Sequence, residues 1–453
     1  GGGGRRFKSY CPDQIYLKLL FCFLLVQHTF FNAHQDTLIM IKLPKRQTGS
    51  PKIKLSTLNG TYQQVHIDGL THEGQGVGRI NGKAVFVENA LPDEIVDIAI
   101  LQDHPQYAQA RVIQFHQTST QRTTPFCTYF GQCGGCQLQH LAPEAQYHWK
   151  QRNFFSQLEQ QLDTRKLQHY TPTQKSAQTY RRRAKFVLVK DPKTKQTRLG
   201  FRQIHSHQVI DIESCPILIP PLNQAYQTLR FDLCPQASRQ AKEYKLLATE
   251  QGVWLNDEAI NHTTQQPSYT IDGLQLHFEP TGFIQVNESV NLDLIHTAID
   301  WLTPQQNGQL LDLFCGIGNF SLPLATKFKQ VIGVDLDATA IAFAERNAKT
   351  NNLNNTAFFS ADLFQPFDHQ AWWQQTYDAI LLDPGRQGAQ HVCQQLSQQT
   401  NTLLYVSCNS STLIRDLKIL EQHGFRLKKA AVFDMFPHTS HYESMVLLER
   451  KTH

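Results

Sequence analysis

The stretch that decides the fold of this chain is Leu403–Asp416, which reads Leu-Leu-Tyr-Val-Ser-Cys-Asn-Ser-Ser-Thr-Leu-Ile-Arg-Asp. Its four apolar or aromatic residues predict a short buried strand. The strand ends near Ser407 and Cys408, and the Ser/Thr-rich residues that follow are typical of a helix start. Ligands of open α/β sheets bind beyond the carboxyl ends of the strands, so Cys408 stands where a nucleophile would be useful. The alternative is a buried structural cysteine, and the surrounding motifs decide between the two.

Strand-like and helix-like segments alternate from Phe283 to the end of the chain. A strand, a glycine loop and a helix follow one another in Gln309-Leu-Leu-Asp-Leu-Phe-Cys-Gly-Ile-Gly-Asn-Phe-Ser-Leu. Further strands are predicted at Val331–Asp335 and Ala379–Leu382. This alternation predicts a doubly wound parallel sheet, a Rossmann-like domain over residues 283–453.

The glycine loop of this domain indicates a nucleoside-containing cofactor. Gly316 and Gly318 let the backbone approach a ligand closely, and Asp335 is placed for ribose hydroxyls. A glycine pair also fits NAD, but Ser321 replaces the third glycine of the dinucleotide fingerprint. Together with Asp312 before the turn, this favours S-adenosylmethionine (SAM).

Three reactive residues are predicted at the carboxyl ends of strands: Asp383, Cys408 and Glu443. Carbon C5 of a pyrimidine accepts a methyl group only after a thiolate has added at C6. A base must then remove the C5 proton so that the thiol can leave, and an acid group facing N3 and O4 would select uracil. Cys408, Glu443 and Asp383 suit these three roles, although Glu443 also fits an ordinary surface carboxylate.

Four cysteines in the middle of the chain have ligand-like spacing. Three stand in Cys127-Thr-Tyr-Phe-Gly-Gln-Cys133-Gly-Gly-Cys136, and Cys215 precedes a proline further on. Four thiolates can hold zinc or an iron–sulfur cluster, and disulfides are the third option. Zinc sites usually contain two short cysteine pairs, so the 3+1 distribution favours a cubane cluster. The other cysteines receive no ligand role: Cys11, Cys22, Cys234, Cys315 and Cys393.

Ahead of these cysteines, residues 50–117 predict a small β-barrel. Short strand candidates start at Val65, Lys83 and Ile95, and four glycines lie in the segment 72–82. The net charge of the 453-residue chain is only +5, so composition alone does not indicate nucleic-acid binding. Basic residues do cluster at 42–54 and at 181–202, which suits either a phosphate backbone or a solvated basic face.

The first residues of the chain need a separate interpretation. The apolar run Leu19–Val26 follows Arg5, Arg6 and Lys8 and imitates a secretory signal. It is too short to span a bilayer, which takes about 20 residues. The first Met is Met40. We therefore expect residues 1–49 to be a non-native or disordered leader, with the true start at Met40.

Residues 50–453 resemble the bacterial RNA uracil-C5 methyltransferases, and most closely the branch that acts on uracil 1939 of 23S ribosomal RNA. The resemblance rests on the barrel, which is similar to an RNA-binding TRAM domain, on the cysteine set, on Tyr180-Arg-Arg-Arg, on Phe283-Ile-Gln-Val-Asn, and on Asp434-Met-Phe-Pro-His-Thr-Ser-His-Tyr-Glu. Two positions depart from the family pattern: Asp335, where relatives usually carry Glu, and Ser410, where they carry Pro.

The resemblance implies an N-terminal OB-like TRAM barrel, a central α+β iron–sulfur and RNA-binding domain at 118–282, and the C-terminal methyltransferase domain. It implies Cys408 as nucleophile, Glu443 as base and a [4Fe–4S] cluster. The implied cluster ligands are Cys127, Cys133, Cys136 and Cys215. The implied SAM contacts are Gln285, Phe314, Asn319, Asp335, Asp362 and Asp383.

The resemblance further implies a monomeric cytoplasmic enzyme, without a membrane anchor, that acts on 23S rRNA. The same chemistry at another 23S rRNA uridine or in tRNA is an alternative. A radical-SAM RNA-modifying enzyme also joins a TRAM domain to an iron–sulfur cluster, but it uses three cysteines with a different spacing.

Overall fold

The computed structural model describes residues 57–204, 206–260, 264–303 and 307–450. The expected leader, with its apolar run at Leu19–Val26, lies outside the described residues, and so does Met40. No helix in the described ranges combines the length and the apolarity needed to cross a bilayer.

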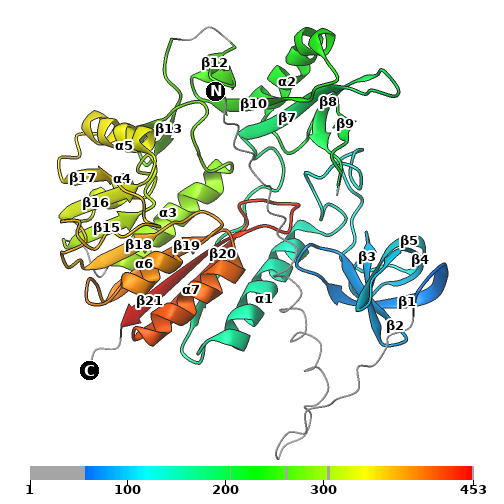
Figure 1. The fold of residues 1–453 in the computed structure, drawn as a ribbon, viewed down its shortest axis with the longest axis horizontal. Helices are drawn as coiled ribbons and strands as arrows, with labels where there is room; N and C mark the ends of the chain where they lie inside the picture. Colours follow the sequence, from blue (N-terminus) through cyan, green and yellow to red (C-terminus); the bar gives the residue numbers. More distant parts are fainter. Residues whose placement is uncertain (1–56, 205, 261–263, 304–306, 451–453) are drawn as a thin grey trace, which may run out of the picture. The chain divides into compact units, whose positions relative to one another are not determined.

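The first described domain is the expected five-stranded barrel (Figure 1). Its strands close in the order β1-β2-β3-β5-β4, and only β3 and β5 are parallel neighbours. Two of the glycines predicted for close approach do serve packing, because a Cβ on Gly76 would lie 2.7 Å from Ala90 Cβ and one on Gly78 would lie 2.9 Å from Val65 Cγ1. The strands are β1 (Thr61–Leu70), β2 (Gly76–Ile80), β3 (Lys83–Glu88), β4 (Ile95–Asp103) and β5 (Tyr107–Gln117).

A six-stranded antiparallel sheet forms the middle of the described chain, in the order β12-β11-β10-β7-β8-β9. The predicted basic hairpin is present as β7 and β8, which pair antiparallel. Helix α2 packs its apolar face on this sheet, and the shared core includes Phe186, Tyr226 and Cys215. The elements are β7 (Arg183–Lys190), β8 (Thr197–Arg202), β9 (Val209–Asp211), α2 (Pro220–Leu233), the short 3-10 helix η3 (Cys234–Gln236), β10 (Lys242–Thr249), β11 (Gly252–Leu255) and β12 (Glu258–Ala259).

The C-terminal sheet has eight strands in the order β17-β16-β15-β18-β19-β21-β20-β6. The strands β17 to β19 are parallel, and β21 runs antiparallel between β19 and β20. After β15 the chain forms β16 and β17 on one side of that strand and then returns to form β18 on its other side. A crevice for a ligand is therefore expected beyond the carboxyl ends of β15 and β18. The strands are β15 (Gln309–Leu313), β16 (Gln330–Asp335), β17 (Thr356–Ser360), β18 (Ala379–Leu382), β19 (Thr402–Ser407), β20 (Phe425–Phe433) and β21 (Glu443–Arg450).

Helices cover both faces of this sheet, as the predicted doubly wound fold requires (Figure 1). One core contains residues of α3, α4 and α5 with alternate strand residues such as Leu310 and Val406. The other contains residues of α1, α6 and α7 with the intervening strand residues such as Leu311 and Tyr405. The helices are α1 (Pro143–Gln161), α3 (Glu288–Leu302), α4 (Ser321–Ala325), α5 (Ala338–Thr350), α6 (Gln390–Gln395) and α7 (Ser410–Gln422). The hairpin β13 (Ser268–Ile271) and β14 (Leu274–His277) precedes α3.

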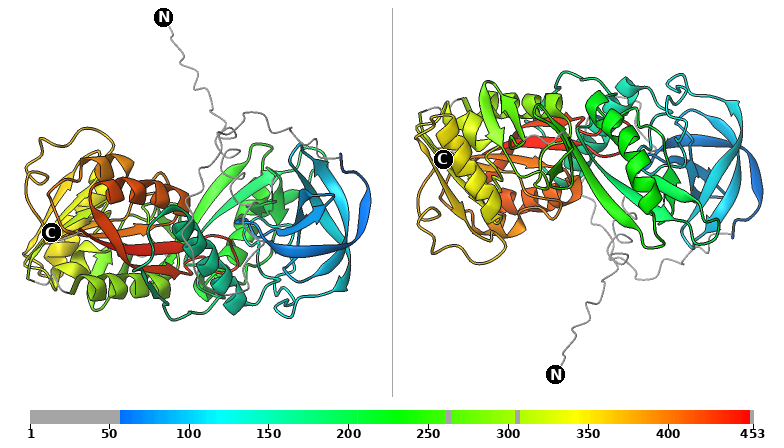
Figure 2. Two further views of the ribbon diagram at one scale, coloured as in Figure 1. Left: turned by 90° about the horizontal axis from the view of Figure 1, so that it is seen from below. Right: turned by 90° about the horizontal axis from the view of Figure 1, so that it is seen from above.

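Two elements from the segment 118–282 join the C-terminal sheet rather than the central one. Strand β6 (Gln168–Tyr170) adds to the edge of the sheet, parallel to β20. Helix α1 packs Phe154 and Leu158 into the sheet's second core, and Figure 2 shows α1 alongside the C-terminal strands. Apolar burial thus crosses the position 282/283, where the sequence motifs indicated a domain boundary.

We expect Gly333→Ala to destabilise the C-terminal domain. Its Cβ would lie 2.5 Å from Phe358 Cδ1 and 2.9 Å from Cys315 Sγ in a closely packed core, and such overpacking costs about 1–3 kcal/mol. Urea denaturation should therefore show a lower free energy of unfolding. The control is Gly385→Ala, whose Cβ would meet no atom within 4 Å; equal stability of both variants would contradict the prediction.

Candidate active site

The pairing of β19 with β21 brings Cys408 and Glu443 together. Ser407, the last residue of β19, stands opposite Ser444 of β21. One step further along this antiparallel register, Cys408 falls opposite Glu443, the first residue of β21. The sequence motifs placed Glu443 at the carboxyl end of a strand, which is wrong. Because β21 is antiparallel to its neighbour, its amino end lies at the same edge of the sheet, so the predicted meeting of the two side chains still occurs.

Asp383 reaches the same edge from β18. It follows the last residue of that strand, Leu382, and its backbone N–H donates to the carbonyl oxygen of Leu313 at 3.3 Å. The parallel register sets Leu382 opposite Tyr405 of β19. The carboxyl end of β18 therefore lies beside the strand that carries Cys408.

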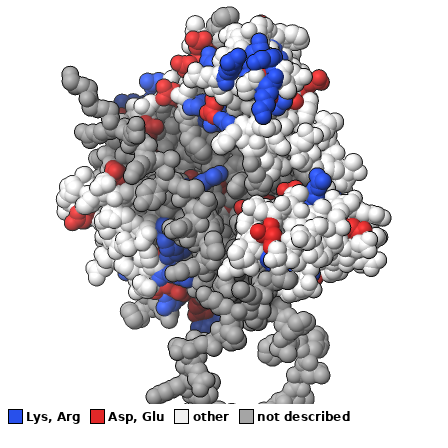
Figure 3. Space-filling model, turned by 45° about the vertical axis from the view of Figure 1, so that its right-hand side comes forward, with Lys and Arg blue, Asp and Glu red and all other residues white. Residues whose placement is uncertain are grey.

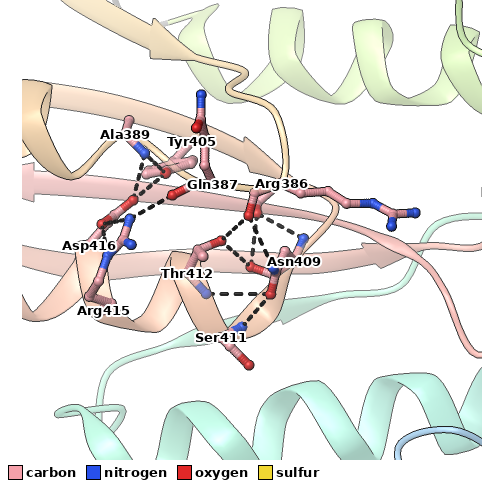
Figure 4. A network of polar contacts seen from close by, with 10 residues as sticks. Arg386, Gln387, Ala389, Tyr405, Asn409, Ser411, Thr412, Arg415 and Asp416 are labelled. Carbon is pink, nitrogen blue, oxygen red and sulfur yellow. Dashed lines mark hydrogen bonds and ion pairs between the residues drawn. The ribbon is translucent and has the colours of Figure 1, made fainter. Parts of the chain in front are cut away.

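A buried polar network holds the loop after Asp383 against helix α7 (Figure 4). The carboxylate of Asp416 accepts hydrogen bonds from the Ala389 N–H and the Tyr405 hydroxyl, each at 2.7 Å. Asn409, which caps α7, donates through Nδ2 to the Arg386 carbonyl oxygen at 3.1 Å. The loop that follows Asp383 and the residue next to Cys408 are thus fixed to each other.

Burial opposes ionisation of the thiol and carboxyl groups of the site. It raises the pKa of the Cys408 thiol to about 11, with a further contribution from Glu443 and Asp383. It raises the pKa of Glu443 well above the usual carboxyl range, and Asp383 adds to this effect. The pKa of Asp383 itself rises to about 7, through burial and then through Asp335. Arg386 opposes the shifts of Cys408 and Glu443.

Arg386 is a site residue that the sequence motifs did not single out. Its guanidinium lowers the pKa of Cys408, Glu443 and His441 and is therefore close to all three. The only signal in the sequence was its place three residues after Asp383 in Leu-Leu-Asp-Pro-Gly-Arg.

The alkylation of Cys408 by iodoacetamide should follow this electrostatic arrangement. Because only the thiolate reacts, the rate should rise about tenfold per pH unit between about pH 7 and pH 9, without a plateau. Asp383→Asn removes a negative charge that raises the pKa of Cys408, so it should accelerate alkylation at a fixed pH. Quantitative mass spectrometry of the Cys408 peptide measures both effects.

The control for this measurement is Asp300→Asn, the same charge change at an exposed position of α3. Its rate should match that of the unmodified protein. A plateau below about pH 8.5 would show that the thiol is already ionised and would contradict the raised pKa.

The glycine loop beyond β15 forms a cradle. Phe314, Gly316 and Gly318 all have positive φ, of 68°, 54° and 89°, and a Cβ on Gly316 would meet nothing within 4 Å. The Gly316 N–H donates to Asp335 Oδ2 at 2.9 Å, and Asp335 Oδ1 accepts from the Asp337 N–H at 2.9 Å. Each carboxylate oxygen keeps acceptor capacity for a hydroxyl group.

Asp312 lies below this cradle and is fully buried. The Ser321 hydroxyl donates to its Oδ2, whereas Oδ1 has no hydrogen-bond partner among the described residues. Burial raises the pKa of Asp312 to about 8, and nearby Asp383 and Asp335 add to the rise. A buried, unsatisfied carboxyl oxygen beneath a glycine loop is typical of a functional site.

Two other residues that are predicted to contact SAM already accept hydrogen bonds within the protein. Gln285 is buried, and its carbonyl oxygen accepts from Arg182 Nε at 3.0 Å. Asn319 Oδ1 accepts from the Tyr269 hydroxyl and from Asn291 Nδ2, both at 2.9 Å. Its oxygen is thus already occupied within the protein.

Phe314, in the cradle, and Asp362 both contact Phe364. The Phe314 ring is 5.8 Å from that of Phe364, between centroids, and the Phe364 N–H donates to Asp362 Oδ1 at 2.9 Å. Phe314, Asp335, Asp362 and Asp383 therefore follow four adjacent parallel strands along one edge. A hydrophobic ring flanked by carboxylates suits an adenosyl group.

The four predicted ligand cysteines lie close enough to influence one another. The pKa of the Cys136 thiol is raised to about 12, first by burial and then by Cys215, Cys133 and Cys127. All cysteines in the described ranges are free thiols, so no disulfide is present there. The described side chains do not, however, form a group of three or more His, Cys, Asp or Glu residues in metal-binding geometry.

The basic segment 181–202 divides into two parts. Arg182 is buried, and Arg183 donates to the carbonyl oxygens of Pro280, at 2.6 Å, and Gly282. These two arginines therefore tie the central sheet to the segment before α3. The rest of the group is more exposed, and Figure 3 shows Lys and Arg gathered in the upper part of the view, where Figure 1 places β7 to β10. Part of that charge is neutralised, since Lys185 and Arg202 both contact Glu243.

Comparison with known proteins agrees with this arrangement of a barrel and a methyltransferase sheet. Residues 56–113 match the TRAM domain family, and residues 248–451 match the tRNA (Uracil-5-)-methyltransferase family. The fold and these two matches thus define an RNA methyltransferase with an attached TRAM barrel.

The matches to two curated relatives cover almost the whole length of each relative. The 23S rRNA (uracil(1939)-C(5))-methyltransferase RlmD of Aliivibrio fischeri is 36% identical over 435 residues, which cover 88% of this chain and 99% of the relative. The RlmD of Vibrio cholerae is 38% identical over 432 residues, with 88% and 98% covered. The chain therefore belongs to the RlmD-type 23S rRNA (uracil-C5)-methyltransferase family.

A solved structure shares the fold across most of the chain. The Pyrococcus abyssi tRNA (uracil-54, C5)-methyltransferase, in complex with S-adenosyl-L-homocysteine, superposes with a TM-score of 0.66. The match covers 85% of this chain and 100% of that one at 20% sequence identity.

Proposed function

We propose that this protein transfers a methyl group from SAM to C5 of a uridine in 23S ribosomal RNA. The proposed target is uracil 1939, the position given in the names of its relatives. The observation that carries the proposal is the β19/β21 register, which sets Cys408 opposite Glu443 with Asp383 on the adjacent strand. Membership of the RlmD family supports it. A ribosomal RNA substrate in turn implies action in the cytoplasm, and we propose that the enzyme acts as a monomer.

Cys408 acts first in this proposal. Its thiolate adds to C6 of the uracil ring and forms a C–S bond, while the ring electrons move to O4 and leave C5 nucleophilic. Because the thiol has a pKa of about 11, attack requires removal of its proton as the base is seated. Arg386, which favours the thiolate, is suited to hold that charge.

Glu443 and Asp383 complete the cycle. After C5 has received the methyl group, the Glu443 carboxylate takes the C5 proton, the ring double bond re-forms and the C–S bond breaks. A carboxyl whose pKa is raised by burial, as for Glu443, is a strong base once it is ionised. Asp383 would meet N3–H and O4 of the ring, which would distinguish uracil from cytosine.

SAM, when bound, supplies the electrophilic methyl group. The cradle fits it: Asp335 offers acceptors for ribose hydroxyls, and Phe314 offers an apolar face beside Asp362. Gln285, Asn319 and Asp383 line the same cleft in this proposal. Asn319, with its oxygen occupied by Tyr269 and Asn291, would contact the cofactor through an N–H.

Two substitutions should separate the catalytic roles. Glu443→Gln permits attack and methyl transfer but removes the base, which typically costs about 10²–10⁴-fold in rate. An enzyme–RNA adduct should therefore accumulate and survive denaturing electrophoresis. Its mass should equal protein plus RNA plus one CH₂ unit, because the methyl group enters as the thiol proton leaves. Cys408→Ala should form no adduct.

A matched control is Glu449→Gln, the same change further along β21, where the residue pairs with Lys428 on the surface. It should turn over normally. Asp383→Ala should weaken uracil recognition before any bond forms, so it should not accumulate an adduct. Normal turnover by Glu443→Gln, or an adduct with Cys408→Ala, would disprove the assigned roles.

The target position is tested separately. Mapping 5-methyluridine in the ribosomal RNA of a deletion strain should show its loss at one 23S rRNA uridine. Loss at a second 23S rRNA uridine, or in tRNA, would favour the alternative substrates.

We also propose that Cys127, Cys133, Cys136 and Cys215 hold a [4Fe–4S] cluster. The fit rests on four free thiols, Cys215 buried and the other three half-buried, within electrostatic reach of one another. Four thiolates packed together without a cation would repel, and a bound cluster would remove that cost. The cluster would join the segment 127–136 to the strand-rich segment around Cys215, as part of a central domain over residues 118–282.

Protein purified without oxygen should be brown and contain about four irons per chain. Cys215→Ala should lose the cluster absorbance and increase hydrogen exchange in the central sheet more than in the C-terminal sheet. The control is Cys393→Ala, at a buried position in the core that α1, α6 and α7 form with the C-terminal sheet. It should keep both the cluster absorbance and the hydrogen-exchange pattern. Stoichiometric zinc without iron would contradict the assignment.

A further inference from the structure

Residues 434–442, the segment between β20 and β21, lead directly into Glu443 and help to set the position of its backbone. Within the described part of the chain, no hydrogen bond holds the Glu443 carboxyl group itself, although the residue is only 5% exposed. The direction of the carboxyl group therefore depends on its backbone. On one side that backbone is fixed by the pairing of Phe433 with Glu443 and of Ser407 with Ser444. On the other side it depends on what holds residues 434–442.

Gln146 of α1 grips this segment at His438. Gln146 Oε1 accepts from the His438 N–H at 2.9 Å, and Nε2 lies 3.2 Å from His438 Nδ1. The same Nε2 donates to the carbonyl oxygens of Leu138 and Leu141, at 2.9 and 2.7 Å. One buried amide thus joins α1, the segment after Cys136 and the loop before Glu443.

Further contacts hold the segment from the same side. The N–H groups of Gln137 and Leu138 both donate to the His438 carbonyl oxygen, at 2.8 and 2.9 Å. Lys150, fully buried on α1, donates to Asp434 Oδ1 at 2.6 Å and to the Phe436 carbonyl oxygen at 3.1 Å.

The backbone at His438 needs such support. Its φ is +64°, a left-handed conformation that is unfavourable for a non-glycine residue. A residue held in that region persists only where its surroundings determine it. The Gln146 amide is among the contacts that hold His438 in this conformation.

We propose that Gln146 and Lys150 are positioning residues for the catalytic base: by fixing residues 434–442 they aim Glu443 at C5, the carbon next to the one bound to Cys408. This inference rests on the proposed function and adds to it a group of residues on α1, outside the catalytic strands. We call the residues that hold segment 434–442, namely Gln137, Leu138, Gln146 and Lys150, the clamp. Because Gln137 and Leu138 belong to it, the segment after Cys136 also has a role at the active site.

The clamp acts on one step of the reaction. Cys408 lies at the end of β19, and its neighbour Asn409 is held by the separate network around Asp416 (Figure 4). Loosening residues 434–442 should therefore spare attack and methyl transfer, while slowing removal of the C5 proton. A displacement of about 1 Å can cost about 100-fold in such a step.

The test uses the full-length protein with RNA that carries tritium at C5 of uridine and SAM that carries a ¹⁴C methyl group. In a single turnover, ¹⁴C incorporation reports methyl transfer and tritium release reports proton removal. Gln146→Met, of similar size but without the amide, should keep methyl transfer within about threefold and slow tritium release by about 10- to 100-fold. The covalent adduct should accumulate accordingly.

The control is Gln151→Met on the same helix, where the amide contacts Tyr147 and Thr171 rather than residues 434–442. It should release tritium as fast as it transfers methyl groups. If Gln146→Met fails to fold, the double variant Lys150→Met/Asp434→Asn loosens the same segment without leaving a buried charge, and should show the same imbalance.

Equal slowing of methyl transfer and tritium release would overturn the inference, since a merely structural role lowers both together. So would an imbalance of the same size in Gln151→Met. Glu443→Gln is measured alongside: if it too shows no imbalance, the proposed function fails, whereas an imbalance in Glu443→Gln alone refutes only the role of the clamp.

Discussion

The antiparallel pairing of β21 with β19 is the constraint on which the candidate active site depends. Every other neighbouring pair from β17 to β19 is parallel, so only this reversal brings the start of one strand to the edge where the others end. It lets a residue that follows β19 face a residue that begins β21. Because side chains alternate along strands, a slip of one residue would turn Glu443 away from Cys408.

The site combines this register with the burial of acids. Asp312, Asp383 and Glu443 all have raised pKa values because the protein withdraws them from water near one another. Such an arrangement disfavours charge in the RNA-free protein. Binding of a cationic sulfonium ligand near these acids would favour their ionised forms, and Arg386 is a nearby cation that moderates the repulsion.

Helix α1 connects parts of the chain that are far apart in sequence. Its apolar face completes a core of the C-terminal sheet, and its polar residues Gln146 and Lys150 hold the loop that leads to Glu443. The packing of the methyltransferase domain and the loop that leads to Glu443 therefore depend on a segment that precedes the domain by more than a hundred positions.

The sequence by itself determined the barrel, the α/β alternation, the glycine loop and the strand–Cys408–helix unit, because these follow from local periodicity, turn residues and caps such as Asn409. It also placed Asp383 and Cys408 at strand ends. Only the tertiary structure decided that Glu443 begins an antiparallel strand, that Arg182 and Arg183 serve internal contacts, and that α1 and β6 belong to the C-terminal sheet. These features depend on strand order and on contacts between distant residues, which no local pattern specifies.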